Sequence, residues 1–233
     1  MRKIFLILIF STNFSIMNAQ ISLTERINTN EAINVVNLNT LTGVFLKKGD
    51  FFKVDVKTAV EHQDLIKVEN KNGEINIFLD SSKKVSNMNQ LAIYITIPNK
   101  PITINAAILT DIQNDGEALI LDNLILNLNT ITTVNLNIIS KNFDLKTTSV
   151  TNLYLHGSTD NGNINISNVT SSDLSHFIVK DLNLSINKID KYGLFFATNH
   201  LTLEANGVKN TIIRGNPIIL SNRTDESIIT FEK

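Results

Sequence analysis

The chain has 233 residues, a formal net charge of −1 and 42% hydrophobic residues. This charge balance gives no electrostatic basis for nucleic-acid binding, and no basic stripe is present. The length fits one large domain, because all-β and repeat folds often reach this size as single domains. The chain has no Cys, so disulfides and a lipidated N-terminal Cys are excluded, and stability has to come from packing and backbone hydrogen bonds.

Residues 1–20 form a predicted signal peptide. Arg2 and Lys3 provide a positive start, Ile4–Phe10 is a short apolar run, and Ala19 suits the position before a cleavage point. The apolar run is much shorter than the roughly 20 residues that a membrane-spanning helix needs, and no later segment is long and apolar enough. We therefore expect an exported mature chain without a transmembrane segment, located in the periplasm, at the cell surface or outside the cell.

Residues 21–32 show little periodicity and are predicted to connect the signal peptide to a folded domain at 33–233. Between residues 33 and 98, short runs rich in β-branched and aromatic residues predict strands separated by turns. These runs are Ile33–Leu38, Val44–Leu46, Phe51–Val56, Leu65–Val68, Ile75–Leu79 and Leu91–Ile97. Asn70–Gly73 predicts a hairpin turn, because Asn and Gly accept positive φ, and Pro98 ends the last strand because it cannot donate a ladder hydrogen bond.

One pattern repeats six times between residues 102 and 217. Each copy opens with an aliphatic residue, and five of the six copies have Asn or Asp seven positions later. The copies open at Ile104, Leu128, Leu145, Ile166, Ile186 and Leu203. A period of about 20 residues with strand-like content is typical of a parallel β-solenoid, in which each coil stacks on the previous one. Helical periodicity is nearly absent, so the predicted class is all-β, with the strands of residues 33–98 forming the first coils or a cap.

The Asn and Asp positions of the repeat are predicted to form a structural ladder. Stacked coils lie about 4.8 Å apart, so equivalent residues form columns, and a column of Asn can pass hydrogen bonds along itself where the backbone turns a corner. Asn and Asp also tolerate the left-handed conformation that such corners require. The ladder residues are Asp111, Asn135, Asn152, Asp173 and Asn210. The alternative is that the matches reflect only the abundance of Asn in this region.

Several segments match a known bacterial family in order. They are Val44–Asp50, Val54–Val56, Asn72–Ile77, Ile93–Pro98, Leu203–Val208 and Arg214–Pro217. Through them the chain, from about Ile33 to Pro217, resembles the head GIN domain family of autotransporter adhesins. The resemblance implies a right-handed parallel β-helix in the cell envelope or outside the cell, and it supplies no catalytic residues. The family usually has Gly in the middle of each repeat, whereas here only Gly207 keeps it; the equivalent positions are Ile108, Thr132, Ser149, Thr170 and Asp190.

No catalytic, metal-binding or phosphate-binding motif stands out. His156 and His176 fall one position apart in adjacent predicted coils. One hypothesis is therefore a metal or acid–base site that includes Asp160 and Asp173. The simpler interpretation is that both histidines lie in exposed loops. Asp111 and Asp173 share a predicted column three coils apart, roughly 14 Å, which is too far for a pair of catalytic carboxylates. We predict no catalytic residue, no metal and no cofactor.

The sequence therefore favours a non-enzymatic binding or adhesion module that recognises a partner with a flat sheet face and its corner loops. A surface glycan or an envelope protein fits as partner, a homo-oligomer is compatible, and nucleic acid is not expected. The first alternative is a carbohydrate-active enzyme, which needs two carboxylates within about 10 Å on one face. The second is a structural role through end-to-end stacking, against which Asp225-Glu226 and Phe231–Lys233 indicate a charged, closed end.

Overall fold

The computed structural model describes residues 21–82, 91–225 and 227–233, so the predicted signal peptide lies outside the described residues. Nearly all of this part is β-structure, as the sequence predicts. The strands are β1 (Ile21–Thr29), β2 (Val35–Asn39), β3 (Gly43–Lys48), β4 (Phe52–Ala59), β5 (Ile66–Lys71), β6 (Glu74–Leu79), β7 (Ala92–Ile97), β8 (Ile102–Asn114), β9 (Leu119–Thr147), β10 (Val150–Asn206), β11 (Thr211–Arg214), β12 (Ile218–Asp225) and β13 (Ile229–Glu232). A 3₁₀ helix, η1 (Val60–Leu65), lies between β4 and β5. No helix in the described ranges has the length and apolarity to cross a bilayer.

These strands belong to one sheet, in which two runs of neighbours meet at β8. The first run, called here the asparagine side, contains β5, β6, β2 and the first half of β8. The second run, called the aromatic side, contains β1, β4, β7, β3 and the second half of β8. The two halves of β8 are separated by Ile108, whose φ of +57° lies in the left-handed region. Both runs continue through β9 in parallel register.

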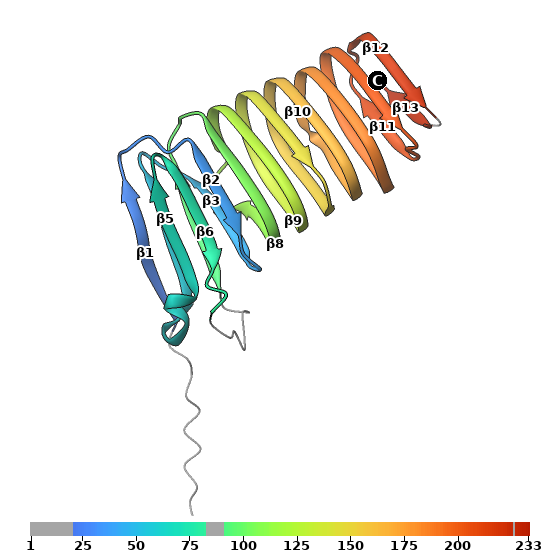
Figure 1. The fold of residues 1–233 in the computed structure, drawn as a ribbon. Coiled ribbons are helices and arrows are strands. Elements are labelled where there is room, and N and C mark those ends of the chain that lie inside the picture. The colour runs from blue at the N-terminus through green and yellow to red at the C-terminus, as the bar shows by residue number, and fades with distance from the viewer. Residues whose placement is uncertain (1–20, 83–90, 226) are drawn as a thin grey trace, which may run out of the picture.

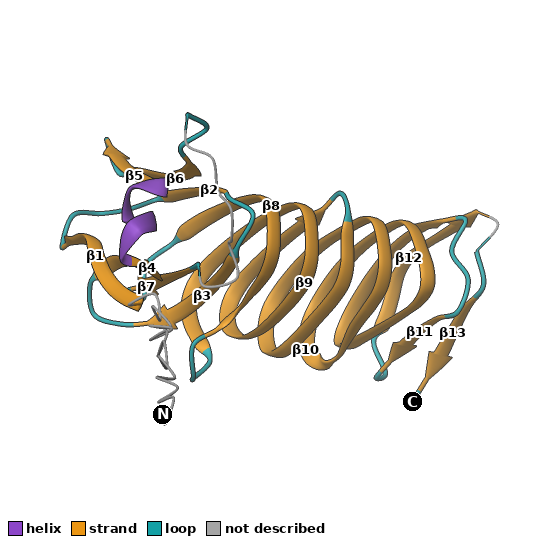
Figure 2. Ribbon diagram, turned by 90° about the horizontal axis from the view of Figure 1, so that it is seen from below, coloured by secondary structure: helices purple, strands orange, loops and turns teal. Residues whose placement is uncertain are grey.

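The chain winds in successive turns along one axis, with the C-terminus at the far end (Figures 1 and 2). Ile102 of β8 lies opposite Leu124 of β9, 22 residues later, and Ile131 of β9 lies opposite Val150 of β10, 19 residues later. Buried and accessible residues alternate along these strands, so one set of aliphatic side chains fills the interior of every turn. Phe143 and Phe177 pack edge to face inside, with ring centroids 5.2 Å apart.

The hairpin and strand predictions for residues 33–98 agree with the observed strands to within a few residues. Asn72 and Gly73 have φ values of +55° and +79° and join β5 to β6 in an antiparallel hairpin, as predicted. β7 ends at Ile97, directly before Pro98. The order of these strands in the sheet differs from their order in the chain, because β2 lies between β6 and β8.

The residues predicted to be a connecting segment form β1 over Ile21–Thr29, so that prediction is wrong for residues 21–29. β1 pairs antiparallel with β4 and forms one edge of the aromatic side. Two of its three large apolar side chains are largely exposed, Ile21 at 46% and Leu23 at 62%, while Ile27 is partly buried against the core. An edge strand that buries so little shows no clear alternation between core and solvent residues, and periodicity cannot detect it.

The C-terminal end of the sheet differs from the charged, closed end that the sequence indicated. β12 pairs with β10 and β13 pairs with β11, and neither has another neighbour among the described strands. Five large apolar side chains are exposed here: Ile218, Ile219, Leu220, Ile228 and Phe231. Arg214 and Glu232 do form an ion pair at 3.0 Å, while Glu226 lies outside the described residues. The end is therefore apolar as well as charged.

Candidate functional site

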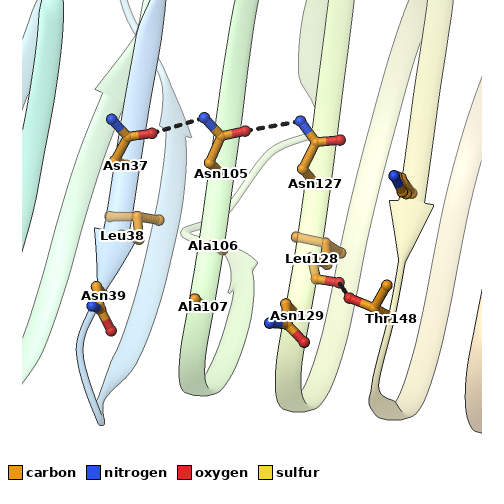
Figure 3. Close-up of a pocket in the computed structure, with 11 residues that line it drawn as sticks. Asn37, Leu38, Asn39, Asn105, Ala106, Ala107, Asn127, Leu128, Asn129 and Thr148 are labelled. Carbon is orange, nitrogen blue, oxygen red and sulfur yellow. Dashed lines mark hydrogen bonds between the residues drawn. The ribbon is translucent and has the colours of Figure 1, made fainter.

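A row of asparagine amides crosses the outer surface of the asparagine side. The register places Asn76, Asn37, Asn105 and Asn127 next to one another on β6, β2, β8 and β9. The Nδ2 of Asn37 donates to the Oδ1 of Asn76 at 2.9 Å. The Nδ2 of Asn105 donates to the Oδ1 of Asn37 at 2.7 Å, and that of Asn127 to the Oδ1 of Asn105 at 2.8 Å (Figure 3). Parallel strands in register make this chain of amide bonds possible, because each Asn faces an identical side chain one strand spacing away.

The outward position of each amide follows from the local sequence. Asn37 stands between Val36 and Leu38, which are 0% and 1% exposed, so strand alternation turns the amide to the surface. Asn105 and Asn127 also lie directly between two buried apolar residues. The same short motif, an Asn between two core residues, thus recurs at matching register positions on three neighbouring strands.

A groove of about 590 Å³ lies beside the amide row. Across β2, β8 and β9, Leu38, Ala106 and Leu128 stand side by side, and so do Asn39, Ala107 and Asn129. Leu38, Ala106 and Leu128 belong to the core, whereas Ala107 lies on the outer face between Asn39 and Asn129, so the side-chain atoms that it lacks leave a hollow between them. Figure 3 shows these residues on their three strands. We call this feature the asparagine groove. Lys146 and Thr148 lie on its C-terminal side.

The groove offers hydrogen-bonding groups of both kinds. Asn76 only accepts in the row, and Asn37 donates to Glu74 as well as to Asn76. Asn105 and Asn127 each donate one N–H within the row, so each keeps a second N–H for a ligand. Asn39 and Asn129 are exposed and add further donors and acceptors. Lys146 is the cationic residue in the lining. An open groove of this volume, with an apolar floor and several uncharged polar groups, has the chemistry of a ligand site that recognises hydroxyl or amide groups.

The predicted ladder residues do not form this row. Asp111 and Asn152 both lie opposite Thr133, whereas Asn135 lies opposite Gln113 and Tyr154, two residues further along. The register differs from the predicted one because Ile104 pairs with Leu126, not with Leu128. Core positions alternate every two residues, so a shift by two keeps every aliphatic residue inside, and apolar periodicity alone cannot fix the register.

The other two predicted ladder residues, Asp173 and Asn210, make different contacts. The Oδ1 of Asp173 accepts hydrogen bonds from the backbone N–H and the Oγ of Ser175, at 3.0 and 2.6 Å. Asn210 has a φ of +57° and donates from Nδ2 to the carbonyl oxygen of Lys191 at 3.3 Å. Asn210 therefore does occupy a left-handed backbone position of the kind expected for these residues.

His156 and His176 lie close together, with ring centroids 5.8 Å apart. The Nδ1 of His176 lies 3.1 Å from the Oγ of Ser175. No group of three or more His, Cys, Asp or Glu side chains suited to a metal ion occurs in the described ranges. On the next turn, partial burial and then the neighbouring Tyr154 raise the pKa of Tyr192. This part of the surface is therefore polar, without a recognisable metal-binding arrangement.

Two carboxylates that the sequence did not bring together meet on the aromatic side. Glu25 of β1 lies opposite Asp55 of β4, and the Nζ of Lys53 lies 3.2 Å from Glu25 and 3.0 Å from Asp55. Hydrogen bonds to Asp55, and next to Glu25, raise the pKa of Lys53. A glycosidase pair needs one carboxyl free to protonate a leaving group, whereas here both carboxylates interact with one ammonium. The pair is an ion-pair network, which sequence reasoning missed because β1 was not recognised.

The fold and the groove define a class: an all-β protein with an extended sheet surface and an open, amide-lined groove across parallel strands. The chain belongs to the family described as "Putative auto-transporter adhesin, head GIN domain", whose model matches residues 33–217. This confirms the family that the sequence resembles. No curated protein matches the chain.

Two solved structures share the fold. A putative adhesin from Bacteroides fragilis superposes with a TM-score of 0.61 at 16% identity, covering 91% of this chain and 96% of that one. A putative adhesin from Parabacteroides distasonis superposes with a TM-score of 0.56 at 14% identity, covering 93% of this chain and 98% of that one. At these identities the likeness concerns the fold alone.

Proposed function

We propose that the protein is an exported, non-enzymatic binding module of the adhesion type, whose asparagine groove holds a glycan chain. The observation that carries the proposal is the amide row of Asn37, Asn105 and Asn127 beside the hollow left by Ala107. An extended chain laid across the strands meets repeated amide groups at the strand spacing, about 4.8 Å. Hydroxyl groups of a sugar chain both donate and accept, which matches amides that offer both N–H and C=O.

The fold proposed with this function is a right-handed parallel β-helix. It is supported by parallel register between β8, β9 and β10, by shifts of 22 and 19 residues between neighbouring turns, and by the winding in Figure 1. Export is supported by the positive start and short apolar run of residues 1–20. Family membership supports the adhesion role, because the family is named for adhesins.

A screen against immobilised glycans tests the binding proposal. We expect retention of at least one polysaccharide by the mature chain, with no release of oligosaccharide. Ala107→Asn copies the residue found on both neighbouring strands, so the backbone should tolerate it while the added side chain fills the hollow. Its control is Thr151→Asn, which adds an amide at an exposed strand position outside the groove lining.

The outcome for the variants decides between the candidate functions. Loss of glycan retention by Ala107→Asn but not by Thr151→Asn supports the groove. Equal retention by both variants contradicts it, and release of oligosaccharide would favour the carbohydrate-active enzyme instead.

An assembly role is favoured by one observation, the exposed apolar residues at the C-terminal end, which include Ile218 at 64% and Leu220 at 63%. Exposed apolar patches next to an unpaired strand edge commonly mark contact surfaces. The prediction of a homo-oligomer is checked by sedimentation velocity of the purified chain, and a monomer at all accessible concentrations would contradict it.

A further inference from the structure

A second concave surface lies on the aromatic side, on different strands from the asparagine groove. Phe45 of β3 and Tyr94 of β7 lie opposite one another and stack, with ring centroids 4.9 Å apart and planes at 15°. Both rings point outward, because their neighbours Val44, Leu46 and Ile93 are fully buried. Half-buried stacked aromatics on an outer sheet face leave apolar surface in contact with solvent.

Two hollows of about 560 and 680 Å³ lie at this aromatic pair, and Tyr94 and Lys57 line both of them. The smaller hollow exists because Gly43 and Ala92 lie side by side next to the rings. A Cβ on Gly43 would come to 3.6 Å from the ring of Phe45, an ordinary contact, so the space is open and not filled by the backbone. Both volumes lie within the range of about 300–1,000 Å³ that is usual for small-molecule sites.

Charged groups of opposite sign flank the floor of the smaller hollow. Lys57 lies opposite Ala92, and Ala92 lies opposite Gly43. Asp111 directly precedes Ile112, the partner of Val44, which places it on the far side of Gly43. Three strand spacings, about 14 Å, therefore separate the Lys57 and Asp111 backbones, with the floor between them. Within the described ranges no ion pair involves Lys57 or Asp111.

The apolar residues around the hollows are unusually accessible. Ile21, Leu23, Leu41 and Phe51 are 46%, 62%, 53% and 39% exposed and line one hollow or the other. The hydroxyl of Tyr94 has no hydrogen bond to a described residue, so it is free for a ligand. A ligand here meets apolar walls, an ammonium, a carboxylate and a phenol within one small space.

A peptide strand is a poor occupant for this surface. β7 is paired on both sides, with β3 and β4, and β3 is paired with β7 and β8, so neither strand of the aromatic pair has an edge free to accept a backbone; the free edge of this side belongs to β1, beyond β4. The ligand has to be recognised by side chains alone. A pyranose suits these groups, because its C–H face packs on apolar and aromatic walls while its hydroxyls accept from Lys57 and donate to Asp111.

We propose that the Phe45–Tyr94 surface is a second carbohydrate site that binds a single pyranose residue. It is independent of the asparagine groove, because the two sites share no lining residue. The site includes Gly43 and Ala92 as its floor and Lys57 and Asp111 as its polar contacts. Asp111 then has a non-enzymatic role, because its carboxylate accepts hydrogen bonds from sugar hydroxyls.

The probes are glucose, galactose, mannose and N-acetylglucosamine, titrated into the isotopically labelled chain and followed by NMR. We expect at least one sugar to shift the backbone amides of Gly43 and Ala92 in a saturable manner. Tyr94→Ala should weaken that binding by about tenfold or more, since it removes the central wall. Phe196→Ala, which removes a half-buried aromatic on β10, is the matched control and should leave the affinity unchanged.

The Gly43 and Ala92 amides decide the outcome. Saturable shifts that Tyr94→Ala removes and Phe196→Ala preserves support the site. Absence of shifts with all four sugars, or equal affinity of Tyr94→Ala and the unmodified chain, overturns it. Ala107→Asn separates the two proposals: it should abolish polysaccharide retention without changing the monosaccharide titration. If Tyr94→Ala fails to fold, Lys57→Ala at the exposed rim provides the same comparison.

Discussion

Several residues hold backbone conformations that L-amino acids rarely adopt, and they mark the corners of the turns. Ile108, Thr130, Asn168 and Lys188 have φ values of +57°, +54°, +51° and +71°. Gly enters this region without strain, whereas each of these four residues carries a Cβ. The sequence placed the missing glycines at Ile108, Thr132, Ser149, Thr170 and Asp190. Ile108 coincides with an observed corner, Thr132, Thr170 and Asp190 lie two residues after one, and Ser149 matches no positive φ in the described part of the chain.

Ile108 is the clearest case of local strain. A β-branched residue in the left-handed region costs roughly 1–2 kcal/mol, and Ile108 is 44% exposed, so its burial offsets little of that cost. We predict that Ile108→Gly is at least as stable as the unmodified chain, because relief of strain outweighs the roughly 0.5–1 kcal/mol by which Gly gains unfolded-state entropy. Urea unfolding at fixed m-value measures the difference.

Ile139 provides the control for this prediction. It is 43% exposed, lies in β9 and has no positive φ. Ile139→Gly should therefore lose about 1 kcal/mol or more, since Gly weakens a strand interior and no strain is relieved. Equal losses at the two positions would show that the Ile108 corner is not strained.

At the scale of elements, the amide row should hold neighbouring strands together as well as lining the groove. Asn105 donates to Asn37 and accepts from Asn127, so Asn105→Ala removes two hydrogen bonds from the middle of the row. At about 0.5–1.5 kcal/mol for each bond, we expect a loss of about 1–3 kcal/mol in the free energy of unfolding. Denaturant midpoints at constant m-value measure this loss.

Asn135→Ala is the matched control for the row. Asn135 is exposed in β9, and its side chain makes no hydrogen bond to another described residue. This variant should change stability by less than about 0.5 kcal/mol. An equally small effect at Asn105 would mean that its two amide bonds merely replace bonds to water.

The strands and their turns follow from the sequence wherever a core face alternates with a wet face. Ala92–Ile97 was predicted to within one residue because its buried positions recur every second residue. Phe52–Ala59 was predicted as Phe51–Val56, three residues short at its end, and its buried positions do not alternate strictly. The register between turns did not follow, since a shift of two leaves the same aliphatic residues inside. The aromatic hollows were not predictable either, because Gly43 and Tyr94 meet only when β3 pairs with β7.

The whole molecule is stabilised without disulfides by one continuous interior and by parallel hydrogen bonding between turns. Fully buried residues extend from Val36 near one end to Ile213 near the other, within a single apolar cluster. Each turn packs on the previous one, so the core forms in the interior and the outer faces can carry different side chains. The asparagine side and the aromatic side thus present two different ligand surfaces on one scaffold.

The central claim is that the asparagine groove holds a glycan, and residue-resolved NMR of the chain with the polysaccharide retained most strongly in the screen tests it most directly. The account predicts saturable shifts of the side-chain amides of Asn37, Asn105 and Asn127 and of the methyl group of Ala107. Shifts confined to other surfaces, such as β12 and β13, with those four groups unmoved, would contradict it.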